Sequence, residues 1–107
     1  MYAKITKVDE LARALAVIGP KWSLQIIDNL LDGPCRFGQI QRSIGGTTAR
    51  VLTVRLRELE AAGLLTRKIY PEIPPRVEYT LTTRGRALGP AIIALQRWGA
   101  RAPKRAD

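Results

Sequence analysis

The stretch "TTARVLTVRLRELEAAG", residues 47 to 63, decides the fold of this chain. It contains three leucines at i, i+4 and i+7, which is the spacing of one face of an α-helix: Leu52, Leu56 and Leu59. Arg50 and Arg57 fall on the opposite face. We therefore expect a helix over about 48 to 61 with one side for a core and one basic side turned to solvent.

Two β-rich runs follow this helix once Gly63 has ended it: "LLTRKIY" at 64 to 70 and "RVEYTLT" at 76 to 82. In the second run, apolar and polar residues alternate, as in a sheet with one wet face. Between the runs lies "PEIPP", whose three prolines lack backbone donors and favour a projecting tip over a tight turn. Helix, strand, wing and strand, in this order, predict a winged helix-turn-helix, an α+β fold that is mainly α.

The rest of the chain supplies the other elements of such a fold. "GG" at 45 and 46 suits the sharp turn of the motif, and Thr47 or Thr48 caps the next helix. "CRF" at 35 to 37 is a candidate short strand. Periodicity predicts further helices over about Val8 to Ile18, Lys21 to Leu31, Phe37 to Ile44 and Thr83 to Arg101, the last with Pro90 in its early part.

The length of 107 residues fits one domain, which we place at 9 to 101, followed by a basic tail at 102 to 107. Apolar residues make up 46% of the chain, enough for a core. A domain this small leaves apolar surface uncovered, and both terminal helices have broad apolar stripes. We therefore expect a homodimer joined through the first and last helices.

The charge of the chain points to nucleic acid. The net charge is +9, and the pI of about 10.6 exceeds the value of about 9 that marks many nucleic-acid-binding domains. Residues 36 to 86 contain ten basic and four acidic side chains, so a net +6 lies on the proposed reading segment. Charge alone does not separate DNA from RNA.

Several classes of protein are disfavoured. The chain has no histidine and one cysteine, Cys35, so it lacks the residues for an ordinary zinc site, an internal disulfide or a Ser-His-Asp triad. No phosphate-cradling glycine loop is present, and we expect neither a cofactor nor enzymatic activity. The N-terminus lacks the apolar core of a signal peptide, and no apolar stretch is long enough to span a membrane. We expect a cytoplasmic protein with no membrane partner.

Five separated segments resemble the HxlR family of bacterial winged helix-turn-helix transcription regulators, and together they extend over about 9 to 101. They are "ALAVIGPKW" at 14 to 22, "RFGQI" at 36 to 40, "LTVRLRELEAAGLLTR" at 52 to 67, "PPRVEYTLTTRG" at 74 to 85 and "LQRWG" at 95 to 99. The set is specific, although "LRELEAAGLL" before a hairpin is shared with MarR, ArsR and PadR-like winged helices.

The resemblance implies a homodimer that regulates a promoter, each subunit reading half of an inverted repeat. Many members carry a cysteine in the first helix, and some use it to sense quinones, aldehydes or oxidants. The matching position here is Asp9, so this chain departs from that sensing route. A small-molecule effector, if there is one, is not identified by the residues.

The basic face of the helix has a direct reading in terms of DNA. An arginine in the major groove bonds bidentately to guanine, and Arg50 and Arg57 are the candidates. Thr53 would meet a thymine methyl or a phosphate, and Thr47 and Thr48 lie where the positive end of the helix attracts phosphate. The alternative is that the two arginines are solvated charges, Arg57 being offset by Glu60. Arg55 lies nearer the core and is a weaker candidate.

The remaining candidates each have two readings. Lys68 and Arg76 flank the wing tip and either contact the minor groove or its phosphates, or serve solubility alone. Arg36 begins a helix that would cross the DNA backbone, so it contacts a phosphate or makes an internal hydrogen bond. Cys35, beside Arg36, is either a redox sensor with a lowered pKa or an inert small hydrophobe. Two further aromatic residues either line an effector pocket or belong to the core: Trp22 and Trp98.

The function expected from these features is a sequence-specific regulator that binds double-stranded DNA. The alternative is a winged-helix interaction module that docks on protein or RNA without reading DNA sequence. The stacking aromatics of single-stranded RNA binders are missing from the basic face. DNA therefore remains the favoured partner.

Overall fold

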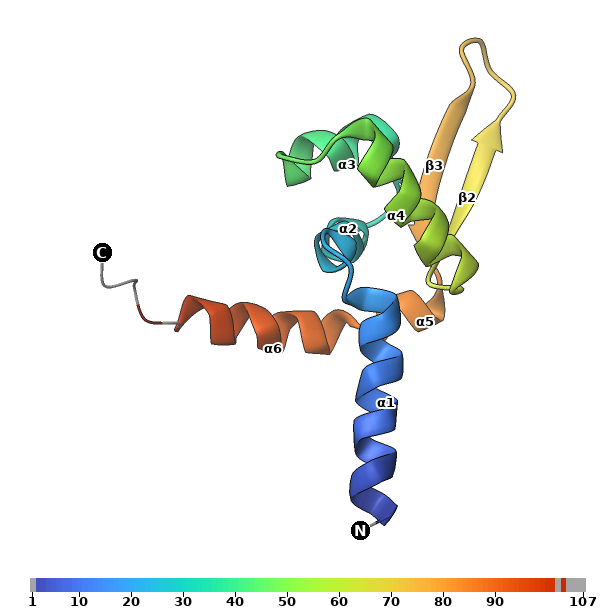
Figure 1. Cartoon of the computed structure of the whole chain (residues 1–107). Coiled ribbons are helices and arrows are strands. Elements are labelled where there is room, and N and C mark those ends of the chain that lie inside the picture. The colour runs from blue at the N-terminus through green and yellow to red at the C-terminus, as the bar shows by residue number, and fades with distance from the viewer. Residues whose placement is uncertain (1, 102, 104–107) are drawn as a thin grey trace.

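The computed structural model describes residues 2–101 and 103, so the predicted tail lies outside the described residues apart from Pro103. The elements in chain order are α1 (Tyr2–Ile18), α2 (Ser23–Leu30), β1 (Cys35–Arg36), α3 (Phe37–Ile44), α4 (Ala49–Ala61), β2 (Leu65–Tyr70), β3 (Arg76–Leu81), α5 (Thr83–Arg86) and α6 (Gly89–Ala100). Helices α3 and α4 form the helix-turn-helix, and β2 and β3 form the wing beside it (Figure 1). The predicted mainly helical winged fold is confirmed.

The core lies where α2, α3 and α4 meet the base of the sheet. Leu52, Leu56 and Leu59 of α4 are all buried, as their spacing predicts. The other buried apolar side chains come from every neighbouring element: Ile26, Ile27, Leu30, Ile40, Leu64, Leu65, Leu81 and Ile92. Because the whole apolar face of α4 is used in this core, its polar face is left outside.

The sheet has three antiparallel strands in the order β1-β3-β2. The short strand predicted in "CRF" forms over Cys35–Arg36 and pairs with β3, with Cys35 opposite Tyr79. In the wing, Lys68 of β2 lies opposite Glu78 of β3. Strand β1 thus anchors the base of the wing to the start of α3.

The turn between α1 and α2 differs from the prediction. Helix α1 is longer than expected and begins at Tyr2, because no residue between Tyr2 and Val8 interrupts the helix. Helix α2 begins at Ser23 instead of Lys21, because Trp22 has a φ of 82° and a left-handed conformation that a right-handed helix does not contain. Lys21 and Trp22 therefore belong to a turn, and the ring of Trp22 packs against the core.

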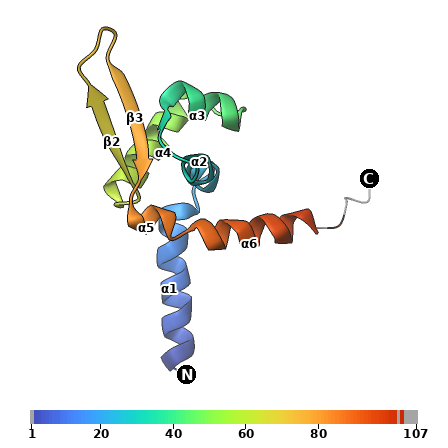
Figure 2. The same cartoon turned by 180° about the vertical axis from the view of Figure 1, so that it is seen from behind.

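The single helix predicted from Thr83 to Arg101 is wrong, because the segment is divided into α5 and α6. Pro90 has no backbone N–H to donate to the carbonyl of Arg86, so it occupies the first turn of a new helix instead of the interior of a long one. Thr82 caps α5 by accepting a hydrogen bond from the backbone of Gly85 at 3.1 Å. After the break, α6 projects from the body (Figure 2).

Helices α1 and α6 project from the body on the side away from the wing (Figures 1 and 2). Apolar residues of their predicted stripes remain exposed in the single chain: Leu11, Leu15, Leu95 and Trp98. Trp98 is 68% exposed, so the core reading of this tryptophan is wrong for the isolated chain. None of the described helices is both long enough and apolar enough to cross a membrane.

Candidate nucleic-acid interface

The turn into α4 has the predicted chemistry. Gly45 and Gly46 have φ values of 64° and 69°, which glycine adopts at little cost. Of the two candidate capping threonines, Thr48 is the cap, and its Oγ1 accepts a hydrogen bond from the backbone N–H of Val51 at 3.1 Å. Thr47 donates its hydroxyl to the carbonyl of Thr48 at 3.4 Å. Both threonines lie at the positive end of α4.

The polar face of α4 has a mixed character. Arg50 and Arg57 are exposed on it, and Val54 between them is 43% exposed. Thr53 is half-buried at the edge of this face and donates its hydroxyl to the carbonyl of Ala49 at 2.8 Å. Since this hydrogen bond uses the hydroxyl proton, Thr53 retains its methyl group and oxygen lone pairs for a ligand.

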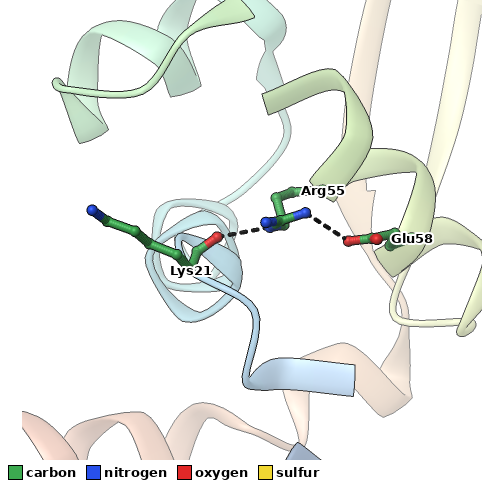
Figure 3. A network of polar contacts seen from close by, with 3 residues as sticks. All are labelled: Lys21, Arg55 and Glu58. Atoms are coloured by element: carbon green, nitrogen blue, oxygen red, sulfur yellow. Dashed lines mark hydrogen bonds and ion pairs between the residues drawn. The ribbon is translucent and has the colours of Figure 1, made fainter. Parts of the chain in front are cut away.

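Arg55 is engaged inside the protein (Figure 3). Its Nε donates to the backbone carbonyl of Lys21 at 2.8 Å, and one terminal nitrogen lies 3.1 Å from Oε1 of Glu58. The side chain is 22% exposed. Arg55 thus ties α4 to the turn between α1 and α2, in agreement with its lower rank as a DNA ligand.

Arg55→Met keeps the aliphatic part of this side chain and removes its donors, so we expect it to lower the free energy of unfolding by about 1 to 2 kcal/mol. The measurement is urea-induced unfolding followed by circular dichroism. Arg57→Met is the matched control on the exposed face of the same helix and should stay within about 0.5 kcal/mol of the parent. Equal stability of the two variants would show that the contact with Lys21 contributes nothing.

Arg76 contacts other residues of the wing. Its two terminal nitrogens lie 3.1 Å from a carboxylate oxygen of Glu72 and 3.9 Å from one of Glu78. The guanidinium also lies 4.0 Å from the ring centre of Tyr70. Lys68 is exposed, with Nζ 4.8 Å from the same ring centre. Of the two predicted wing cations, Lys68 is therefore the one that faces solvent.

Arg36 is the residue before α3, where its backbone N–H donates to Oε1 of Gln39 at 2.8 Å. Its side chain is exposed and lines a groove of about 410 Å³ between the start of α3 and the wing tip. The internal contact at this position is thus made by the backbone of Arg36. The guanidinium remains available to a ligand beside the wing.

Of the two readings of Cys35, the redox sensor with a lowered pKa is not supported by the surroundings of the thiol. Burial, and then the charge of Asp32, raise the pKa of this thiol above its usual value. Its Sγ lies 3.6 Å from the carbonyl oxygens of Asn29 and Gly33, and the side chain is half-buried, whereas that of Arg36 is exposed. Neighbouring residues in a strand point to opposite faces, so Arg36 does not activate the thiol. These surroundings favour the inert reading.

The ion pairs show which basic side chains have an acidic partner within the protein. All four acidic residues of the segment 36–86 lie within ion-pair distance of arginines other than Arg50 and Arg57: Glu58 near Arg55, Glu60 near Arg67, and Glu72 and Glu78 near Arg76. Glu60, which we considered as an offset for Arg57, lies 3.9 Å from Arg67 instead. Within the described part of the chain, no acid lies within ion-pair distance of Arg50 or Arg57.

Two exposed apolar residues were missed as site candidates. Val54 lies on the polar face of α4, between Arg50 and Arg57, and Ile73 lies at the wing tip. An apolar residue on an otherwise polar helix face, or inside a proline-rich loop, is a signal that the sequence contains.

Comparison with known proteins agrees with this geometry. A family model described as HxlR-like helix-turn-helix matches residues 17–107. A protein of Methanothermobacter thermautotrophicus, described only as an HTH-type transcriptional regulator, is 49% identical over 86 residues, which cover 80% of this chain and 66% of that protein. The chain thus spans about two-thirds of the length of this relative.

Solved structures share the fold. A transcriptional regulator of the MarR family from Enterococcus faecalis is 47% identical, with a TM-score of 0.78 over 88% of this chain and 86% of that one. The redox regulator HypR in its oxidized form is 38% identical, with a TM-score of 0.84 over 90% of this chain and 99% of that one. This chain belongs to the HxlR-like helix-turn-helix family and has a fold of the winged-helix type.

Proposed function

We propose that the chain binds duplex DNA as a homodimer, with α4 in the major groove and the wing on the adjacent minor groove or backbone. One observation carries the DNA contact: the acids of the segment 36–86 lie near other arginines, which leaves Arg50 and Arg57 exposed on one face of α4. An exposed guanidinium on a helix that fits the major groove is the side chain that most often reads guanine.

The other predicted residues have supporting roles in this proposal. Thr47 and Thr48 lie at the positive end of α4, where backbone N–H groups attract a phosphate. Lys68 and Arg36 flank the wing and would neutralise phosphates without reading bases. Val54 and Thr53 offer methyl groups to the major groove, where a thymine methyl is the complementary feature.

The homodimer is supported by the exposed apolar stripes of α1 and α6. Trp98 and Leu11 are more than half exposed in the single chain, which is an unfavourable state for side chains of this size unless a second surface covers them. A twofold dimer presents the two copies of α4 to successive turns of the duplex, so the expected operator is an inverted repeat. Regulation would follow from occupancy of the promoter.

The test is selection of bound duplexes from a random-sequence library at physiological salt, followed by affinity and stoichiometry measurements on the enriched sequence. We expect an inverted repeat bound by two chains, with an affinity that falls steeply as salt rises. Enrichment of no sequence, or equal affinity for the selected duplex, a scrambled duplex and single-stranded RNA, would favour the interaction module instead. Salt must be stated with each affinity because phosphate contacts dominate it.

A further inference from the structure

The wing ends in an apolar side chain. Ile73, in the loop between β2 and β3, is 101% exposed, more than any other large apolar residue for which the structure describes exposure. The wing projects beyond the body of the helix-turn-helix in both views (Figures 1 and 2). Ile73 is therefore at the end of the element that would reach farthest toward a bound duplex.

The loop that carries Ile73 is held in place. Pro71, Pro74 and Pro75 restrict the backbone on both sides of it. At the base of the loop, the backbone N–H of Glu72 donates to the carbonyl of Tyr70 at 2.8 Å. Arg76 joins Glu72 to Glu78 and stacks on Tyr70. Because these prolines and contacts restrain the tip, contact through Ile73 would cost little conformational entropy.

The terminal nitrogens of Arg76 are paired within the wing, although its Nε is not paired with a described residue. Arg76, the basic residue closest to Ile73 in sequence, has two acidic neighbours, and its Nε is buried without a hydrogen-bond partner among the described residues. A guanidinium held in this way is not extended beyond the tip. The end of the wing thus offers an apolar surface, with the exposed cations Lys68 and Arg36 behind it.

We propose that Ile73 enters the minor groove as an apolar contact and that Arg76 is a positioning residue that holds it there. This rests on the proposed binding of duplex DNA. Apolar side chains in the minor groove contact sugars and base edges, and the guanine 2-amino group obstructs them, so the wing would favour A·T pairs. Lys68 and Arg36 would meet the phosphates on either side.

The test uses the selected duplex and a copy in which 2,6-diaminopurine replaces adenine at the pairs that the wings protect from hydroxyl radicals. This base adds an amino group in the minor groove and leaves the major-groove edge of adenine unchanged. We expect the parent protein to bind the modified duplex about tenfold more weakly. Ile73→Ala should lose about tenfold on the unmodified duplex and little more on the modified one.

Ile69→Ala is the matched control, because Ile69 is an exposed isoleucine that belongs to β2 of the same wing and is paired with Val77, outside the tip loop. It should keep both the affinity and the discrimination of the parent. Arg76→Gln should lose affinity as Ile73→Ala does, and it should also lose the discrimination against diaminopurine. Its binding should keep the salt dependence of the parent. Arg76→Lys should restore the affinity and the discrimination in part. A fall of about one in the salt slope for Arg76→Gln would instead make Arg76 a phosphate ligand.

Two outcomes would overturn the inference while leaving the proposed function intact. The first is equal affinity of Ile73→Ala and the parent for the selected duplex, which would assign the tip to another partner, such as a protein. The second is an Ile73→Ala variant that loses affinity but still discriminates against diaminopurine as the parent does. Failure of the parent protein to enrich any duplex would instead count against DNA binding itself.

Discussion

Trp98→Glu is expected to convert the proposed dimer into a monomer and to weaken binding to a two-half-site operator by at least about a hundredfold. The introduced charge lies in the apolar stripe of α6, where Trp98 is 68% exposed in the single chain and makes little contact with its own core. In a dimer, binding of one recognition helix holds the second near its half-site at a high effective concentration. A monomer binds each half-site separately and lacks this gain in affinity. Sedimentation equilibrium and fluorescence anisotropy measure the two effects.

Ala100→Glu is the control for this substitution. It introduces the same side chain into α6 at an exposed position about 160° around the helix from Trp98. It should leave the dimer and the operator affinity largely intact. Leu11→Glu tests the same interface from α1, where Leu11 is 61% exposed. Persistence of the dimer in both stripe variants would show that these helices are not the interface.

Arg57→Ala is expected to remove base discrimination at one position of each half-site. A bidentate contact from arginine to guanine discriminates by about 1 to 3 kcal/mol, and in a dimer the loss occurs twice. Affinities for the selected duplex and for duplexes with each base changed in turn measure the effect. Arg50→Ala should act in the same way at a different base pair, since Arg50 lies two helical turns away on the same face.

Lys68→Ala is the comparison for both arginine variants. Lys68 is exposed in the wing and is proposed to meet a phosphate, so its loss should weaken all duplexes alike and reduce the salt slope by about one for each subunit. If Arg57→Ala also weakens every duplex equally and reduces the slope, Arg57 contacts the backbone and does not read a base. The two variants thus separate specific from nonspecific contacts.

The engaged arginines explain why the charge count alone is a poor guide to the site. The sequence offers ten basic residues between 36 and 86, but Arg55 and Arg76 are held by internal partners. Arg55 binds a carbonyl 34 residues earlier in the chain, a contact that no local pattern indicates. Arg76 looked equivalent to Lys68 as a wing cation, yet its position beside Tyr70 and two acids gives it another role.

The sequence by itself determined the elements whose signal is local. The leucine spacing of α4, the glycines of the turn, the capping threonine and the alternation in β3 all depend on neighbours a few residues apart, because helices and strands repeat over that distance. The buried face of α4, the wing and the third strand at Cys35 were predictable for this reason. The family motifs extended these predictions to the whole domain.

Only the tertiary structure decided which side chains have partners within the protein and which are left for a ligand. The left-handed Trp22, the division of the last helix before Pro90, the raised pKa of Cys35 and the pairing of Arg76 depend on the three-dimensional geometry of turns and strands, and the contact of Arg55 with Lys21 joins segments that are 34 residues apart. Burial, hydrogen bonds and ion pairs depend on distances in space, and these follow from the packing of the whole chain. Sequence periodicity indicates which way a side chain faces, but not what it meets there.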